Sequence, residues 1–292
     1  MHKESVGLPG RGVRLVADRW DPEPGQAAGP VLLLHGGGQT RHSWKQTGAR
    51  LSAAGWTAVA VDTRGHGDSD WPADGDYSLD ALVADVVAVA GHLDAAPVLV
   101  GASLGGYAAL VAQGENPALG RALVLVDIVP RVEARGTDRI GAFMRSGLDG
   151  FDSLQDVAAA ISAHTPGRRQ TPSEAGVRKN VRLRQGRWYW HWDPRLIETP
   201  AGPDQSSPQS TRSQARALSA ATTVRVPTLI VRGVQSDVVS DRGVAELRSL
   251  IPAAEYVSVD DAGHMIVGDD NDVFTAHLVN FLRRCVGPVP PS

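Results

Sequence analysis

The sequence predicts an α/β fold, a doubly wound and mostly parallel sheet that carries an inserted helical cap. Two observations support this fold class. Short unbroken apolar runs, typical of strands covered on both faces, alternate with stretches of helical periodicity. The alternation stops near Pro130 and resumes at Pro227, with no strong strand in between. The sequence therefore divides into a core domain, residues 1–130 and 214–292, and a helical cap, residues 131–213.

The core elements follow from local sequence. Residues 6–20 are typical of a hairpin at a sheet edge, because two β-prone segments flank the turn residues 9–12. Apolar residues at helical spacing predict a helix over 78–93, with Ser78 as a suitable N-cap. The other predicted strands are apolar runs at 31–34, 56–62, 98–100, 121–127, 227–232 and 255–259. The other predicted core helices end near residue 55, begin near residue 107, or cover 241–250 and 272–284.

The cap is predicted to be helical. Residues 135–148, 153–164 and 174–184 have helical character, and residues 199–213, rich in proline and serine, predict a linker. An insertion at this point of a doubly wound sheet lies above the carboxyl ends of the strands, where ligands bind. We therefore expect the cap to act as a lid.

Composition gives little support to several classes of partner and location. A formal net charge of -3 over 292 residues gives no general reason to expect a nucleic acid or an anionic membrane as partner. The single cysteine, Cys285, cannot form an intrachain disulfide, and the N-terminus lacks the apolar stretch of a signal peptide. No apolar run is long enough to span a bilayer. We expect a soluble cytoplasmic protein, and the sequence does not predict its oligomeric state.

The stretch 98–107 carries the strongest chemical signal. An apolar run leads into Gly101-x-Ser103-x-Gly105, and a helical stretch follows, which is the strand, turn and helix setting of a nucleophilic serine. The glycines leave room for a strained turn that projects the hydroxyl outward. Ser103 is therefore the candidate nucleophile. The alternative interpretation is a glycine-rich turn in which the serine is incidental.

Such a serine needs a base and a carboxylate that orients the base. His264 follows the last predicted strand and is the candidate base. Asp237, in the loop after the penultimate strand, and Asp127, at the end of the strand before the cap, both open on the rim of Ser103. The loop pattern around Asp237 favours it, with Asp127 as the alternative acid. The order Ser103, Asp237, His264 is then the order found in this fold.

The negative oxygen of a tetrahedral intermediate needs two backbone N–H donors. Leu104, directly after the nucleophile, supplies one. The glycine loop 36–38 supplies the other, where Gly37 is favoured and its neighbour Gly36 is the alternative and a candidate substrate contact. A loop without this role is the competing interpretation. Phosphate binding is not predicted, because neither glycine-rich phosphate motif is present.

These residues resemble the α/β-hydrolase superfamily over nearly the whole chain. The shared motifs are His35-Gly36-Gly37-Gly38, Asp62-x-Arg64-Gly65-His66-Gly67-x-Ser69, Gly101-x-Ser103-x-Gly105-Gly106, Ser236-Asp237 and Gly263-His264. The resemblance is to the lid-bearing branch, which includes carboxylesterases, lactonases, perhydrolases, carbon–carbon bond hydrolases, epoxide hydrolases and haloalkane dehalogenases. The last two use an aspartate where this chain has Ser103. The resemblance implies serine hydrolysis and leaves the substrate open.

Two features of the cap bear on the substrate. Trp188, Trp190 and Trp192 could stack on an apolar substrate group, although packing of the cap onto the sheet domain is the favoured interpretation. Basic residues outnumber acidic ones between Arg168 and Arg195. A solvated helix face is the default interpretation, and the alternative is that one or two arginines hold a carboxylate of the substrate. The basic residues are Arg168, Arg169, Arg178, Lys179, Arg182, Arg184, Arg187 and Arg195, against Glu174 and Asp193.

The sequence thus predicts a serine hydrolase that cleaves a small carboxylic ester or lactone. One form of this prediction is that the substrate is an ester with a free carboxylate. The alternatives on the same three residues are a carbon–carbon bond hydrolase and a cofactor-free perhydrolase. A ligand receptor that turns over once is a remote alternative from another class. No cofactor is expected, and no metal site, because paired His or Cys spacing is absent.

Overall fold

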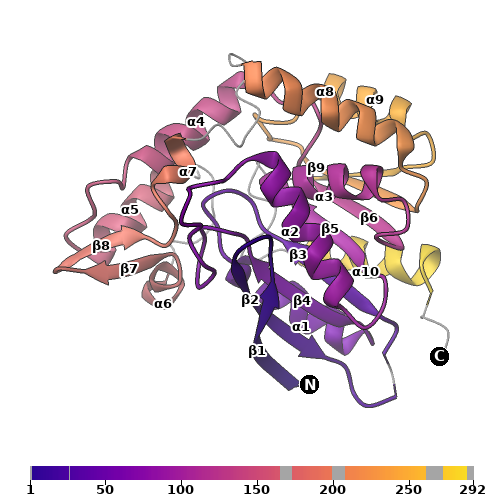
Figure 1. Cartoon of the computed structure of the whole chain (residues 1–292), viewed down its shortest axis with the longest axis horizontal. Helices are drawn as coiled ribbons and strands as arrows, with labels where there is room; N and C mark the ends of the chain where they lie inside the picture. Colours follow the sequence, from indigo (N-terminus) through magenta and orange to yellow (C-terminus); the bar gives the residue numbers. More distant parts are fainter. Residues whose placement is uncertain (1, 26, 165–172, 199–207, 261–271, 288–292) are drawn as a thin grey trace.

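The computed structural model describes residues 2–25, 27–164, 173–198, 208–260 and 272–287. It confirms the predicted fold class: an eight-stranded, mostly parallel sheet runs through the molecule with helices on both sides (Figure 1). The strand order is β1-β2-β4-β3-β5-β6-β9-β10. The strands are β1 (His2–Pro9), β2 (Arg14–Asp21), β3 (Pro30–Leu34), β4 (Thr57–Asp62), β5 (Val98–Ala102), β6 (Ala122–Val126), β9 (Thr228–Gly233) and β10 (Glu255–Val259).

The predicted edge hairpin is also confirmed. Strands β1 and β2 pair antiparallel at one end of the sheet, and β2 pairs antiparallel with β4. All other pairs in the sheet are parallel. The carboxyl ends of β3, β5, β6 and β9 therefore open on one edge.

The apolar runs form strands because each is covered on both faces. In β3, Leu32 and Leu34 pack with one cluster of buried side chains, and Val31 and Leu33 pack with the other, as the alternation of a strand requires. One cluster is covered by α2 (Leu79–His92), α3 (Ser103–Glu115), α8 (Pro208–Thr223) and α9 (Asp241–Leu250). The other is covered by α1 (Lys45–Ala53) and α10 (Asp272–Cys285). Ser78 caps α2 as predicted, accepting the N–H of Ala81.

The chain between β6 and α8, residues 131–198, lies to one side of the sheet and is called the inserted segment here (Figure 1). Helices occur in the first two predicted ranges, but the third prediction is wrong. Only 174–178 of the predicted helix 174–184 is helical, and the chain then forms a hairpin. The segment contains α4 (Ala134–Arg145), α5 (Leu154–His164), α6 (Glu174–Arg178), β7 (Val181–Arg184), β8 (Arg187–Trp190) and α7 (Arg195–Glu198).

The hairpin has a local cause that the sequence contains. Gln185 and Gly186 link β7 to β8 and have φ angles of 48° and 83°, the left-handed pair that a two-residue hairpin turn requires. The aromatic residues that follow favour a strand.

The predicted linker 199–213 is partly wrong. Residues 208–213 begin α8, with Pro208 at its first position, where a missing N–H costs nothing. Residues 199–207 lie outside the described part of the chain. The predicted boundary between residues 213 and 214 consequently falls within a helix.

The contact of α3 with the end of β3 gives a stability prediction. A Cβ added at Gly105 would lie 2.6 Å from the carbonyl oxygens of His35 and Leu34, whereas one added at Gly91, near the end of α2, meets nothing within 4 Å. We expect Gly105→Ala to lower the free energy of unfolding by about 1 to 3 kcal/mol. The control Gly91→Ala should raise it by up to about 1 kcal/mol. Urea unfolding measures both, and an unchanged stability in Gly105→Ala would contradict the close approach.

Candidate active site

Ser103 stands where β5 gives way to α3. It has a φ of 46°, a left-handed conformation that is strained for a residue with a side chain and is typical of functional turns. The turn is tight enough that a Cβ at Gly101 would lie 2.5 Å from the backbone of Gly106. Ser103 and the next residue, Leu104, are half-buried. Because Leu104 lies in the first turn of α3, its N–H has no acceptor within the helix.

The glycine loop 36–38 lies beside Ser103. A Cβ added at Gly36 would be 3.3 Å from the Cβ of Ser103. The N–H of Gly36 donates to Oε1 of Gln39 at 3.0 Å, and the N–H of Gly38 donates to Nε2 of His66 at 3.1 Å. Neither bond uses the N–H of Gly37. Of the three loop glycines, Gly37 is thus the one these contacts favour as a donor to an oxyanion.

The peptide between Gly36 and Gly37 is held through its carbonyl group. The Gly36 oxygen accepts from Nδ1 of His35 at 2.8 Å and from the N–H of Gln39 at 3.1 Å. In a trans peptide the N–H points opposite to the C=O, so these bonds also set the direction of the Gly37 N–H. The loop is therefore preorganised around this group.

His35 and His66 are both buried, and their rings meet edge to face at 5.0 Å. Nε2 of His35 accepts the N–H of Thr63 at 3.0 Å, which assigns the proton of the neutral ring to Nδ1. Nδ1 of His66 lies 3.1 Å from the carbonyl oxygen of Arg64, which assigns the same tautomer. Burial lowers the pKa of His35 to about 4 and that of His66 to about 3. Both rings are consequently neutral near pH 7.

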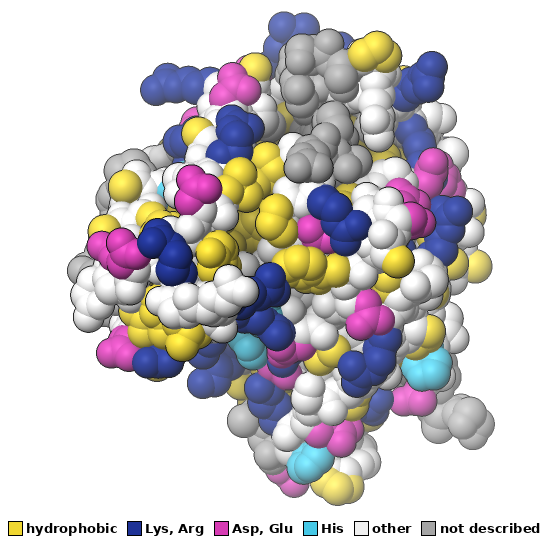
Figure 2. Space-filling model, turned by 60° about the vertical axis from the view of Figure 1, so that its left-hand side comes forward, with side chains coloured by type: hydrophobic (Ala, Val, Ile, Leu, Met, Phe, Trp, Pro, Cys, Tyr) yellow, Lys and Arg dark blue, Asp and Glu magenta, His cyan; other side chains and the backbone are white. Residues whose placement is uncertain are grey.

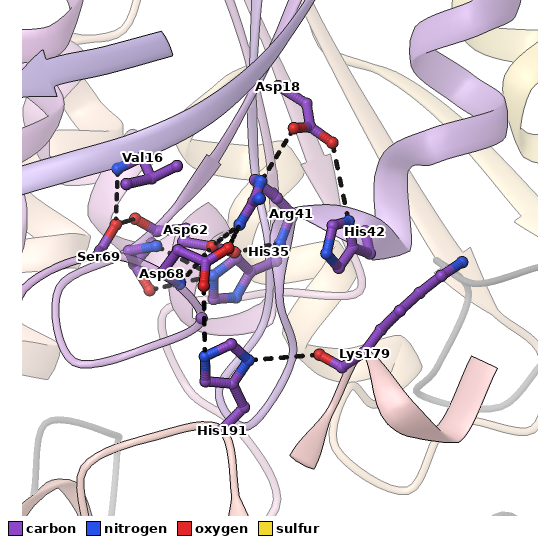
Figure 3. A network of polar contacts seen from close by, with 12 residues as sticks. Val16, Asp18, His35, Arg41, His42, Asp62, Asp68, Ser69, Lys179 and His191 are labelled. Carbon is purple, nitrogen blue, oxygen red and sulfur yellow. Dashed lines mark hydrogen bonds and ion pairs between the residues drawn. The ribbon is translucent and has the colours of Figure 1, made fainter. Parts of the chain in front are cut away.

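A charge cluster in which Arg41, Asp18 and Asp62 are buried and Asp68 is exposed connects these loops (Figure 3). The side chain of Arg41 forms ion pairs with Asp18, Asp62 and Asp68. Its backbone N–H also donates to Oδ1 of Asp62 at 2.6 Å, and Oδ2 of Asp62 accepts the N–H of Asp68 at 2.9 Å. The cluster joins the chain after the glycine loop to the turn that carries His66.

Asp127 is the first residue after β6, as Ser103 is after β5, and the preceding residues Ala102 and Val126 are paired in the sheet. Asp127 is 1% exposed and has a φ of 49°. One of its carboxylate oxygens accepts the N–H of Gly233 at 3.0 Å, and the other accepts the hydroxyl of Ser236 at 2.6 Å. A carboxylate has about four acceptor positions, and these two bonds use one on each oxygen.

Asp237 lies four residues after β9 and contacts the inserted segment. The guanidinium of Arg139, on α4, donates from Nε to Oδ2 at 2.6 Å and from Nη2 to Oδ1 at 2.7 Å. This two-pronged geometry is the strongest that an arginine and a carboxylate form. The hydrogen bond to Asp237 raises the pKa of Arg139.

His264 lies outside the described residues, so its assignment as the base stays a prediction. Strand β10 ends at Val259, paired with Gly233 of β9. Because β10 is parallel to β9, it ends at the same edge of the sheet as β5 and β6.

The tryptophans in β8 and just after it pack mainly against other side chains of the protein. Trp190 and Trp192 are 4% and 2% exposed, and their rings stack at 4.8 Å. A Cβ added at Gly38 would touch the ring of Trp192 at 3.6 Å. Trp188 is half-buried, with the guanidinium of Arg178 5.1 Å from the centre of its ring. These contacts fit the packing interpretation, and they place Trp192 against the glycine loop.

Sequence reasoning gave no role to Arg139 or His66. The contact of Arg139 spans 98 positions and has no local signal. His66 belongs to a motif shared with the superfamily. The motif indicated a turn but did not indicate what the ring of His66 contacts.

Within the described residues, no group of three or more His, Cys, Asp or Glu could hold a metal ion. In the same part of the chain, no helix has the length and apolar character needed to cross a membrane.

Comparison with known proteins agrees with this architecture. The family model for the alpha/beta hydrolase fold matches residues 29–270. The chain is 33% identical over 260 residues to an esterase of Mycobacterium tuberculosis, covering 86% of this chain and 80% of the relative. It is 29% identical over 263 residues to a 2-(acetamidomethylene)succinate hydrolase of Mesorhizobium japonicum, covering 88% and 89%. A crystal structure of E-2-(acetamidomethylene)succinate hydrolase superimposes with a TM-score of 0.81 at 24% identity, over 97% of this chain and 100% of that one.

The two buried histidines predict a dependence of stability on pH. Their pKa values, about 4 for His35 and about 3 for His66, lie below the value of about 6.5 expected in the unfolded chain. Between these values the unfolded state binds more protons, so stability is complete above about pH 6.5 and is lost as the pH falls through 6.5 toward 4. We expect a loss of up to about 1.4 kcal/mol per pH unit for each ring.

Urea unfolding at about pH 7.5, 6 and 5 measures this loss. His66→Gln removes one titrating ring. It should therefore reduce the loss of stability per pH unit by up to about 1.4 kcal/mol, the contribution of one proton. An identical slope in the variant and the native chain would contradict the prediction.

Proposed function

The chain belongs to the α/β-hydrolase fold family and is a hydrolase, and from that premise we propose that it cleaves a small carboxylic ester or lactone through an acyl-enzyme on Ser103. The observation that carries the proposal is the strained Ser103 at the start of α3, directly beside the glycine loop. A hydroxyl next to two preorganised N–H groups is what acyl transfer requires.

In the proposed reaction, Oγ of Ser103 attacks the ester carbonyl carbon while His264 takes the hydroxyl proton. The carbonyl oxygen becomes negative and accepts from the N–H groups of Gly37 and Leu104. The intermediate then collapses, the bond to the alcohol oxygen breaks, and His264 gives its proton to that oxygen. Water repeats the sequence on the acyl-enzyme, which releases the acid and restores the serine.

The contacts of the two candidate carboxylates favour Asp127 as the acid that orients His264. Asp127 is buried, follows β6 as Ser103 follows the neighbouring strand β5, and accepts from two neutral donors. Asp237, favoured by its loop pattern, has both oxygens on the guanidinium of Arg139. A carboxylate already neutralised by a cation stabilises an imidazolium less. Asp237 remains the alternative acid. If Asp127 orients the base, we propose that Asp237 instead holds α4 over the rim through its ion pair with Arg139.

We also propose that the inserted segment covers the active site. Helix α4 extends between two loops of the rim: a Cβ at Gly136 would lie 2.5 Å from the carbonyl oxygen of Asp237, and Cγ of Met144 is 3.7 Å from the Cβ position of Gly38. The helix therefore crosses above the carboxyl ends of the strands, where substrates of this fold class bind.

A free carboxylate on the substrate has mixed support. The succinate in the name of one relative's substrate favours it. However, four arginines of the basic stretch form ion pairs with acids of this chain: Arg178, Arg182, Arg187 and Arg195 with Glu174, Asp68, Asp152 and Asp193. Figure 2 shows basic side chains spread among hydrophobic ones on this face of the molecule. These contacts fit a solvated, ion-paired surface better than an anchor for an anion.

The first test of the proposal is labelling by a fluorophosphonate. We expect the native chain to be labelled and Ser103→Ala to be unlabelled, with hydrolysis of nitrophenyl esters lost by about 10⁴-fold or more in the variant. Ester hydrolysis that survives Ser103→Ala would refute the proposal. On the native chain, a diketone substrate would reveal carbon–carbon bond cleavage, and a peracid assay would reveal perhydrolysis. Comparing hydrolysis of a monoester acid with that of its neutral diester tests whether the enzyme recognises a free carboxylate on the substrate.

The second test separates the two carboxylates. We expect Asp127→Asn to lower kcat by about 10³ to 10⁴-fold, because an amide orients the wrong imidazole tautomer. Asp237→Asn should cost less than about tenfold, as loss of a structural ion pair would. Steady-state kinetics on one nitrophenyl ester measures both, with circular dichroism as the check of folding. The reverse ranking would assign the role to Asp237.

A further inference from the structure

The turn that carries His66 is bound to both the glycine loop and the inserted segment. Nε2 of His66 accepts the N–H of Gly38, which belongs to the peptide that joins Gly37 to Gly38. The preceding peptide is held through the Gly36 carbonyl by His35. Both peptides that flank the α-carbon of Gly37 are thus fixed, one by each histidine. A glycine has the widest backbone freedom of any residue, so these two bonds remove the freedom that matters most here.

The bond to Gly38 depends on the charge of His66. An imidazole accepts a hydrogen bond only in its neutral form, in which one ring nitrogen lacks a proton. The ring of His66 is fully buried, and its Nδ1 is 3.1 Å from Oγ1 of Thr63 and 3.1 Å from the carbonyl oxygen of Arg64. The protonated nitrogen therefore has acceptors within reach, and the unprotonated one faces Gly38.

The inserted segment holds the turn in place. His66 and Trp192 form an antiparallel bridge, flanked by bonds from the Gly67 N–H to the His191 oxygen and from the Asp193 N–H to the Gly65 oxygen, both 2.8 Å. Asp68, in the same turn, lies 3.7 Å from Nε2 of His191 (Figure 3). The ring of Trp192 packs against the Gly38 position from the side of the inserted segment. Gly38 is consequently confined by His66 and by Trp192.

We propose that His66 is a positioning residue for the oxyanion hole: it fixes the Gly38 N–H and thereby aims the N–H of Gly37 at the reacting carbonyl oxygen. This inference rests on the proposed function, because it assigns Gly37 as the donor. The ring touches neither substrate nor nucleophile. Its effect falls on the transition state, in which the oxygen becomes negative, and leaves binding of the uncharged ester unchanged.

The test compares His66→Met, which fills the site but offers the N–H only a weak thioether acceptor, with His66→Gln, whose Oε1 can take the place of Nε2. His92→Met, at an exposed histidine near the end of α2, is the matched control. The measurements are amide hydrogen exchange at Gly38, together with kcat and KM for a nitrophenyl ester. We expect His66→Met to speed Gly38 exchange at least about tenfold and to lower kcat about 10 to 100-fold, with KM within about twofold.

His66→Gln should restore both exchange protection and kcat to within about fivefold of the native chain, a rescue that loss of packing alone would not give. Unchanged Gly38 exchange, or unchanged kcat, in His66→Met would overturn the inference while the loss of activity in Ser103→Ala still supports the proposed function. Hydrolysis that persists in Ser103→Ala would overturn both, so the two failures are distinguishable.

Discussion

The close approach of α3 to the end of β3 is the constraint on which the rest of the site depends. The N–H of Gly105 donates to the carbonyl oxygen of His35 at 3.2 Å, and no side chain separates the two backbones. This contact brings Ser103 beside Gly36 and fixes the first turn of α3 against the glycine loop. The proposed nucleophile and the N–H groups around it therefore share one rigid base, in which this backbone contact is completed by the buried side chains of His35 and His66.

The core was predictable because its signals are local. Unbroken apolar runs, a Ser78 cap and the glycines around Ser103 each act within a few residues, and the sheet adds only the order of the strands. The inserted segment was less predictable, because its elements are short and their type is decided by tertiary contacts. The hairpin of β7 and β8 depends on a Gln185-Gly186 turn, a weaker signal than Asn-Gly, and α8 begins inside a stretch whose composition is typical of linkers.

The limits of sequence reasoning are clearest for the two carboxylates. Strand order places Asp127 and Asp237 on the same rim, and a loop pattern can rank them only by likeness to other chains. What distinguishes them physically is their partners: Asp237 faces the cation of Arg139, and Asp127 faces the hydroxyl and N–H of a neighbouring loop. Arg139 comes from the inserted segment, so its position could not be derived before that segment was placed.

The contacts of the inserted segment divide it into two parts with different attachment. Residues 191–193 are joined to the turn 65–67 by two backbone bonds, and Arg182 adds an ion pair to Asp68, so displacement here would break several bonds of about 1 kcal/mol each. Helix α4 has only Gly136 buried, and its main polar attachment is the Arg139 pair with Asp237. If the segment opens to admit substrate, fewer polar bonds break at α4, whose Phe143 also packs on Trp190. Opening there would keep the bonds between residues 191–193 and the turn 65–67, which hold His66 and Trp192 beside the glycine loop. Under the proposed function, substrate entry would then be separate from the geometry that stabilises the transition state.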